Sequence, residues 1–429
     1  MKNIEVIGGG TVSHVRNHLA LTAPAYGNTA REIYKLCNLE NNPSLGNDYE
    51  YNISLHLTKM ASSGESDLET NEDISNLVDK LILNPETKII FFNPALVDFN
   101  GSIATGAAAG YEWYDNAHTK SGKYETRLKT SEGEQRMLLT PAAKILGKIR
   151  KTRKDIFLVA FKTTCGATED EQFLRGLHLL KDNSCNLVLA NDTKTRTNMI
   201  ITPEQARYSV TTDRELALQE LVTMTLARAS NTFTRSTVVS GPTIPWDMEN
   251  IPHSLKAVVE HCIAKGAYKL FNGSTVGHFA FKKTDKMFIT SKRKVDFNKL
   301  KEVGMVMCVT NGDNDVVAYG SKPSVGGQSQ RIIFREHPEM DSIIHFHLEA
   351  YDKSKLSVKE QKFVECGSHA CGQNTSNGLR LEENGIKCVY LDNHGPNIVF
   401  NSSIDPQKVI AFIDKHFDFK RCTDGIVRN

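Results

Sequence analysis

Continuously apolar strands alternate with helices in the first half of the chain, and this alternation restricts the fold more than any other feature. The predicted strands are short runs rich in β-branched or aromatic residues, at 4–7, 88–92, 156–161 and 187–190. Segments with helical periodicity and composition lie at 29–36, 169–180 and 213–229. Strands that are apolar on both faces need helices above and below them, so the pattern predicts an α/β domain with a parallel sheet.

The pattern breaks between residues 230 and 251, where Pro, Gly and Ser replace the periodicity. We therefore predict a first domain at 1–230, a linker at 231–250 and a second domain at 251–429. The second domain is predicted to contain more consecutive strands, including 279–282 and 305–309, between helices at 255–265 and 406–415. The second domain is therefore also predicted to be α/β, but with consecutive strands in place of a regular alternation of strands and helices.

The bulk composition excludes several classes of function. The 429 residues have a formal net charge of only +2 and 24% charged residues, so nothing global indicates nucleic-acid binding. No apolar run approaches the length of a membrane span, and the first residues lead directly into a strand without a signal-peptide core. Nine scattered cysteines without a paired framework indicate reduced thiols. We expect a cytoplasmic protein that acts on a small molecule.

Three histidines in the second domain have the pattern of a metal site. His345 and His347 end an apolar, strand-like run, and His394 follows a second such run at 388–391. Side chains two apart on a strand share a face, so both imidazoles of the first pair are predicted to reach one ion. Three neutral imidazoles with an open fourth position are typical of catalytic zinc, although iron, manganese or nickel fits the same ligands. The alternative is a chance pair of partly buried histidines.

A glycine cluster follows the first predicted strand. Gly8, Gly9, Gly10 and Thr11 stand where phosphates bind in many α/β domains, because glycine lets backbone N–H groups approach an anion. The cluster is not a dinucleotide-binding fingerprint, and a tight turn after the strand explains it equally well.

The first 230 residues resemble the phosphopantothenate–cysteine ligase (phosphopantothenoylcysteine synthetase) family. The resemblance rests on motifs that occur in the family's order, at 7–11, 15–16, 26–27, 97–99, 160–163 and 189–192. It implies a Rossmann-like fold that uses CTP or ATP with Mg²⁺ to activate a carboxylate for attack by an amine. It also implies that the Gly8–Thr11 loop faces the phosphates and that Asp98, Phe161 and Asn191 line the nucleotide site. Lys129 is the nearest match to the family's lysine-rich loop and would neutralise triphosphate charge.

This half departs from the family at two places. Ala20 stands at the position of an asparagine that helps to hold the acyl intermediate, and 22–25 replaces a Ser-Ser-Gly-Lys stretch. Both differences indicate altered chemistry. A domain that is kept only for scaffolding is the alternative.

Residues 248–429 resemble the class II aldolase/adducin family. The resemblance rests on ordered motifs at 272–274, 288–290, 322–324, 337–338, 344–347 and 393–395. Members with all three histidines bind zinc, which acts as a Lewis acid toward two adjacent substrate oxygens. The resemblance implies that His345, His347 and His394 are the ligands.

Here too the sequence departs from the family. Gly326 occupies the position of the acid/base glutamate, and we predict Glu349 or Glu365 as its substitute. His278 and Val325 alter the phosphate-binding positions, whereas Ser324 and Thr290 remain.

Residues 365–372 contain a Cys-x-x-His-x-Cys spacing that matches no strong zinc pattern. His369 lies close to the family's substrate-loop tyrosine, so we predict that it binds substrate. An ordinary glycine-rich turn with small buried thiols is the alternative.

Together these features predict a bifunctional enzyme, with a nucleotide-dependent ligase-like domain fused to a zinc-dependent, aldolase-like lyase domain. The substrate is expected to be a small phosphorylated or hydroxy-carbonyl metabolite, and self-association as a homodimer or homotetramer is expected. The alternative is a metal- or nucleotide-binding scaffold that has lost catalysis, as adducin-like proteins have.

Overall fold

The computed structural model describes residues 2–40, 51–104, 119–324 and 327–424, which divide into two compact units. The first unit comprises 1–200 and 209–225, and the second comprises 201–208 and 226–429. The segment 231–250, predicted as a linker, contributes a strand and the buried Trp246 to the second unit. Within the described part of the chain, no helix is both long enough and apolar enough to cross a bilayer.

The first unit is built on a seven-stranded sheet with the order β12-β11-β10-β9-β5-β1-β4. Strands β4, β1, β5, β9 and β10 run parallel, as the continuously apolar runs predict. The strands of this unit are β1 Lys2–Gly10, β2 Val12–Arg16, β3 Leu19–Thr22, β4 Tyr51–Leu57, β5 Thr87–Ala95, β6 Phe99–Ala104, β7 Thr119–Lys120, β8 Met137–Pro141, β9 Phe157–Thr164, β10 Leu187–Asp192, β11 Asn198–Ile201 and β12 Arg207–Thr211.

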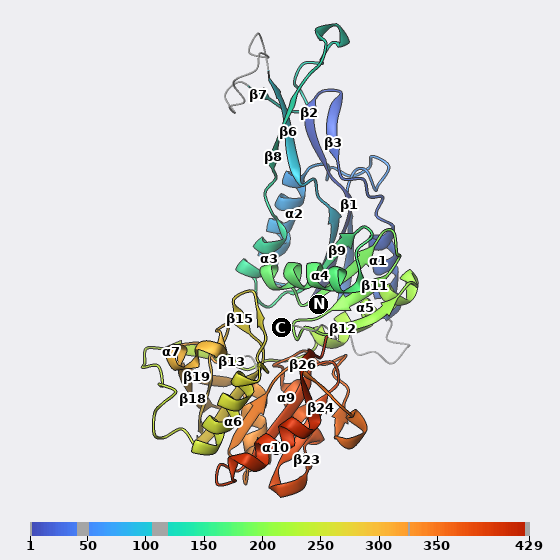
Figure 1. Ribbon diagram of the computed structural model, residues 1–429. Helices are drawn as coiled ribbons and strands as arrows, with labels where there is room; N and C mark the ends of the chain where they lie inside the picture. Colours follow the sequence, from blue (N-terminus) through green and yellow to red (C-terminus); the bar gives the residue numbers. More distant parts are fainter. Residues whose placement is uncertain (1, 41–50, 105–118, 325–326, 425–429) are drawn as a thin grey trace. The chain divides into compact units, whose positions relative to one another are not determined.

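Helices cover this sheet, and a smaller β structure stands beyond it. Helix α1 packs on β1 and β4, and α4 packs on β9 and β10. The β2–β3 hairpin packs against β6, which pairs with β7 and β8, and Figure 1 shows these strands together beyond one end of the parallel sheet. The helices are α1 Asn28–Glu40, α2 Asn71–Leu83, the short 3₁₀ helix η3 Thr130–Glu132, α3 Leu146–Thr152, α4 Glu169–Asn183 and α5 Arg214–Ala229, whose last residues belong to the second unit.

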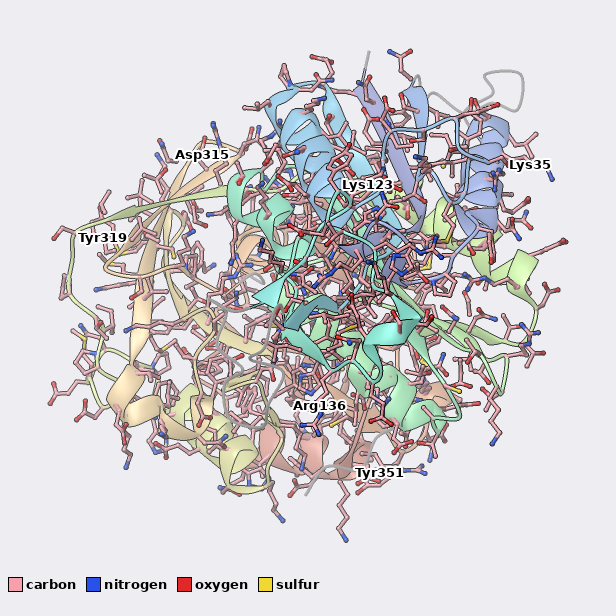
Figure 2. All side chains as sticks on the ribbon, turned by 90° about the horizontal axis from the view of Figure 1, so that it is seen from above. Lys35, Lys123, Arg136, Asp315, Tyr319 and Tyr351 are labelled. Atoms are coloured by element: carbon pink, nitrogen blue, oxygen red, sulfur yellow. The ribbon has the colours of Figure 1, made fainter. Side chains whose placement is uncertain are left out.

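The second unit is built on a larger, mainly antiparallel sheet with the order β13-β19-β18-β17-β16-β20-β25-β24-β22. Its edge strand β13 pairs in parallel with β19, whose first and last residues, Asp315 and Tyr319, are labelled in Figure 2. The strands are β13 Arg235–Val239, β14 Leu270–Phe271, β15 Ser274–Thr275, β16 His278–Thr284, β17 Met287–Ser291, β18 Met305–Asn311, β19 Asp315–Tyr319, β20 Ser342–His345, β21 Leu348–Ala350, β22 Val358–Lys359, β23 Arg380–Leu381, β24 Lys387–Leu391, β25 Gly395–Phe400 and β26 Phe417–Cys422.

An apolar core forms where α6 and α10 pack on each other beside this sheet. Trp246, Phe279 and Phe412 belong to this core. A second cluster, which includes Ala280, Val306 and Ile343, is likewise buried. The helices are α6 His253–Ala264, α7 Leu300–Val303, α8 Gly327–Glu336, α9 His369–Gly378 and α10 Pro406–His416, with 3₁₀ turns η4 Phe297–Lys299, η5 Lys353–Lys355 and η6 Glu383–Gly385.

Candidate metal centre

The sheet of the second unit brings two separate histidine segments to the same edge. Strands β20 and β24 both pair antiparallel with β25, which lies between them, so β20 and β24 run in the same direction. His345 ends β20, and His394 lies in the turn that follows β24. The carboxyl ends of the two strands therefore point to one place, as the sequence predicts.

Gly395 allows the turn that carries His394 to approach the first histidine segment closely. It has φ +112°, and a Cβ at this position would collide with the carbonyl oxygen of Phe346 and crowd the Cα of His347. The glycine of the Asn-His-Gly sequence is thus needed for the close approach of the turn, and the histidine supplies the imidazole.

The three imidazoles form a compact, buried triangle. One ligand atom from each of His345, His347 and His394 lies within 4.8 Å of the others. The ring centroids are 4.9 Å apart for His345–His347, 4.8 Å for His345–His394 and 4.9 Å for His347–His394. His347 lies just beyond the end of β20, so the pair is not contained in one regular strand as predicted, although both rings reach the same cluster.

His345 is held in the form that a metal ligand needs. Its Nδ1 lies 2.8 Å from the Pro396 carbonyl oxygen, which only accepts, so Nδ1 carries the proton and Nε2 keeps its lone pair. Desolvation lowers the pKa of His345 to about 4, against the weaker opposing effect of the Pro396 carbonyl. The ring is therefore neutral at physiological pH.

A fourth histidine adjoins this triangle. The His278 ring centroid is 4.9 Å from that of His345, and its Nδ1 is 2.6 Å from Nε2 of the buried Gln330. Burial, and then the proximity of His345, hold the pKa of His278 well below its usual range. Its position beside the triangle agrees with the predicted substrate-binding role, which stays a prediction. Sequence reasoning did not identify Gln330.

Cys366 also reaches the triangle, which sequence reasoning missed. Its Sγ lies 3.5 Å from His394 Nε2. The only signal in the sequence was the Cys-x-x-His-x-Cys spacing, which does not say that one of these thiols meets the distant His-x-His segment.

The two predicted glutamates have different surroundings. Glu349 lies on β21 with its side chain 30% exposed, 3.6 Å from Lys353 Nζ, which also pairs with Asp392. Glu365 is buried beside Cys366 in the chain, and its backbone N–H donates to Asn231 Oδ1. Gly326 and Val325 lie outside the described residues.

Of the remaining predicted substrate residues, Thr290 and Ser324 both bond at the β16–β17 pair, and His369 lies on α9. Thr290 is fully buried on β17, and its hydroxyl donates to the Phe279 carbonyl oxygen. Ser324 is half-buried, and its N–H donates to the Ser291 carbonyl oxygen. His369 begins α9, lies 2.9 Å from Thr234 Oγ1 and lines a surface pocket of about 300 Å³ with Arg331 and Arg335.

In the first unit, the glycine cluster is explained by packing of the protein on itself. A Cβ at Gly10 would collide with the Ala23 carbonyl oxygen, because residues 23–25 cross directly over the loop. The N–H groups of Gly10 and Thr11 donate to the carbonyls of Ala25 and Ala95. The Thr11 hydroxyl is fully buried and donates to Asn71 Oδ1. These two N–H groups are therefore engaged within the protein.

Gly8 and Gly9 are also buried in close packing. A Cβ at Gly8 would overlap the Ala30 side chain, and a Cβ at Gly9 would overlap that of Thr58. The three glycines are thus the last residues of β1 rather than a turn after it, and close packing requires small residues there; the phosphate-facing role of Gly8, Gly9, Gly10 and Thr11 stays a prediction.

The other predicted nucleotide residues differ in exposure. Asn191 lies one residue before the carboxyl end of β10, where ligands of α/β sheets bind, and Phe161 lies in the second half of the neighbouring parallel strand β9. Asp98 follows β5, is 72% exposed and pairs with Lys144 at 2.7 Å. Lys129 is exposed and immediately precedes η3. Phe161 and Asn191 thus lie on neighbouring strands of one sheet, and the nucleotide role of all four residues stays a prediction.

Comparison with known proteins finds similarity in the fold of each half. No protein-family model matches the chain, and no curated protein matches it. The DNA/pantothenate metabolism flavoprotein from Streptococcus pneumoniae is 18% identical with a TM-score of 0.42, over 52% of this chain and 96% of that one. The C-terminal domain of the coenzyme A biosynthesis bifunctional protein CoaBC is 12% identical with a TM-score of 0.33, over 52% and 91%. An L-fuculose 1-phosphate aldolase is 16% identical with a TM-score of 0.27, over 42% and 92%. The matched structures are of the two kinds that the sequence resembles.

Proposed function

We propose that the second unit is a metal-dependent lyase that acts on a small hydroxy-carbonyl compound, with zinc held by His345, His347 and His394. The observation that carries the proposal is the buried triangle of imidazoles whose ligand atoms lie within 4.8 Å of one another. A divalent cation that prefers neutral nitrogen ligands fits this donor set.

The protein's own side chains would divide the remaining tasks. Bound zinc would supply Lewis-acid stabilisation of negative charge on substrate oxygens. The Pro396 carbonyl keeps His345 in the ligand tautomer. With Gln330 Nε2 donating to His278 Nδ1, the neutral His278 ring carries its proton on Nε2 and can donate to a substrate oxygen.

Glu365 is the better candidate for the proton acceptor that Gly326 cannot provide. It is buried and precedes Cys366, whose sulfur contacts His394. Glu349 is already paired with Lys353 at a more exposed position. Proton transfer at a carbonyl compound needs a carboxylate within hydrogen-bond reach of the substrate, and Glu365 is the buried candidate on the segment that contacts His394.

Solvent deuterium exchange would test the lyase proposal. A panel that includes dihydroxyacetone phosphate and L-fuculose 1-phosphate would be incubated with zinc-loaded protein in D₂O and followed by proton NMR. We expect exchange or cleavage of at least one compound, lost in His347→Ala and kept in the control His261→Ala, whose ring pairs with Asp414 on the surface. Bound zinc without exchange in any compound would favour the scaffold alternative.

For the first unit we propose a nucleotide-dependent, carboxylate–amine ligase-like activity that uses CTP or ATP with Mg²⁺. The support is the parallel sheet, with Asn191 at the edge where such sheets bind ligands and Phe161 on the neighbouring strand. Pyrophosphate release from CTP and ATP in the presence of carboxylate and amine substrates would test it. We expect Asn191→Ala to reduce the release and Asn183→Ala, at the end of α4, to leave it unchanged. No release with either nucleotide would leave this unit as a scaffold.

A further inference from the structure

We propose that Cys366 is a fourth protein ligand of the metal at the histidine triangle. The inference rests on the proposed metal site and extends it, because it adds a thiolate to the three imidazoles. The donor set would then be three imidazole nitrogens and one sulfur, and a substrate oxygen of the proposed lyase reaction would enter as a fifth ligand.

The distance between Cys366 and His394 is what two ligands of one zinc ion would show. Zinc–sulfur and zinc–nitrogen bonds of about 2.3 and about 2.0 Å at a tetrahedral angle put the two ligand atoms roughly 3.5 Å apart. The Cys366 Sγ to His394 Nε2 distance is 3.5 Å. The sulfur is therefore at ligand spacing from His394, one member of the triangle.

The loop that carries Cys366 is built to keep the sulfur there. Residues 365–368 form a turn in which the Ser368 N–H donates to the Glu365 carbonyl oxygen. The Ser368 hydroxyl then caps α9 by accepting from the Cys371 N–H. Asn231 ties both sides of the turn together, because its Oδ1 accepts from the Glu365 N–H and from the Ser368 hydroxyl.

A buried ion pair holds the preceding residues of the same loop. Arg228 donates to the carbonyl oxygens of Lys362 and Gln361, and its guanidinium pairs with Glu204 at 2.7 Å. Both side chains of the pair are fully buried. The loop therefore approaches His394 with its backbone fixed on two sides, which is how a site keeps its ligands in place.

A sulfur ligand narrows the choice of metal, because thiolate with imidazole favours zinc over magnesium, calcium or manganese.

Cobalt substitution tests this assignment directly. Co²⁺ would be added to the metal-free full-length protein and followed by visible and near-ultraviolet absorption. We expect the d–d bands of a tetrahedral site together with a sulfur-to-cobalt charge-transfer band. Cys366→Ser should keep cobalt binding but lose the charge-transfer band, whereas Cys371→Ser should keep the band. Cys371 is the matched control because it lies on the same segment and contacts Gln361 Nε2.

Thiol protection gives a readout that does not depend on a variant folding. Wild-type protein with and without zinc would be alkylated with iodoacetamide, and the cysteine peptides quantified by mass spectrometry. Zinc should protect Cys366 and leave the exposed Cys165 of the first unit equally reactive in both samples.

The outcomes separate this inference from the proposed function. Cobalt bound without a charge-transfer band, with Cys366 equally alkylated in both samples, would overturn the thiolate ligand and leave the three-histidine site standing. No cobalt or zinc bound by the wild-type protein would overturn both.

Discussion

The buried Arg228–Glu204 pair should be among the most sensitive positions in the second unit. Both side chains are 0% exposed and their charged atoms are 2.7 Å apart. Arg228→Met removes the cation, leaves the Glu204 carboxylate buried without its charge partner, and breaks the bonds to the 361–362 backbone. Removing one partner of a buried pair destabilises by about 3–5 kcal/mol. We expect a loss of that size in the free energy of unfolding.

The matched control is the exposed Arg235–Asp315 pair, in which Arg235 is 82% exposed. Arg235→Met should cost no more than about 1 kcal/mol, because water screens such pairs. The assay is urea unfolding followed by the fluorescence of Trp246, which is 2% exposed in the core of the same unit. A Trp113→Phe background would remove the other tryptophan of the chain. Equal losses for Arg228→Met and Arg235→Met would refute the reasoning, as would a Glu204→Leu/Arg228→Met double variant that is no more stable than Arg228→Met alone.

Three further predictions follow from single positions. In native protein, Ellman's reagent should modify the exposed Cys165 rapidly and the buried Cys308 only after unfolding. The reason is that burial raises the pKa of the Cys308 thiol to about 12. Fast reaction of Cys308 would contradict its burial. Gly395→Ala should abolish zinc binding, measured by equilibrium dialysis, because the new Cβ collides with the Phe346 carbonyl; an unchanged affinity would show that the turn relaxes easily. Desolvation raises the pKa of Asp192, but five hydrogen bonds, four of them from backbone N–H groups, lower it by more. The pKa of Asp192 is therefore lower in the folded than in the unfolded protein. The stability that the Asp192 carboxylate contributes is complete above about pH 4 and is lost progressively as the pH falls below this value. Asp192→Asn should therefore lower the urea midpoint more at pH 7 than at pH 3. An equal effect at both pH values would refute this prediction.

The sequence predicts the parts of this fold that follow from local pattern. The parallel strands of the first unit are recognisable because they are buried on both faces and read as continuous apolar runs. Strand β13 was missed, since all of its residues are exposed at a sheet edge and it has no apolar alternation to detect. Its pairing with β19 is decided by tertiary structure alone.

Some residues of the candidate site were likewise predictable from local sequence, and others were not. The three histidines were predicted because two strand ends and a His-x-His spacing are visible in the sequence. Cys366 was not assigned to them, since its place depends on contacts with Asn231, far away in the chain. The glycine cluster is a different case: its composition predicts a phosphate site, which stays a prediction, and the structure adds that Gly10 accommodates the backbone of residues 23–25. Composition alone cannot separate these two uses of glycine.

The central claim is that His345, His347 and His394 together hold a metal ion, and elemental analysis tests it most directly. Protein purified without chelators would be compared with a His345→Ala/His347→Ala variant, before and after incubation with zinc and dialysis. We predict about one zinc per chain in the wild-type protein, as for a site with three histidine ligands, and none in the variant. Wild-type protein that retains no metal after zinc incubation, or a variant that retains as much as the wild type, would contradict the claim.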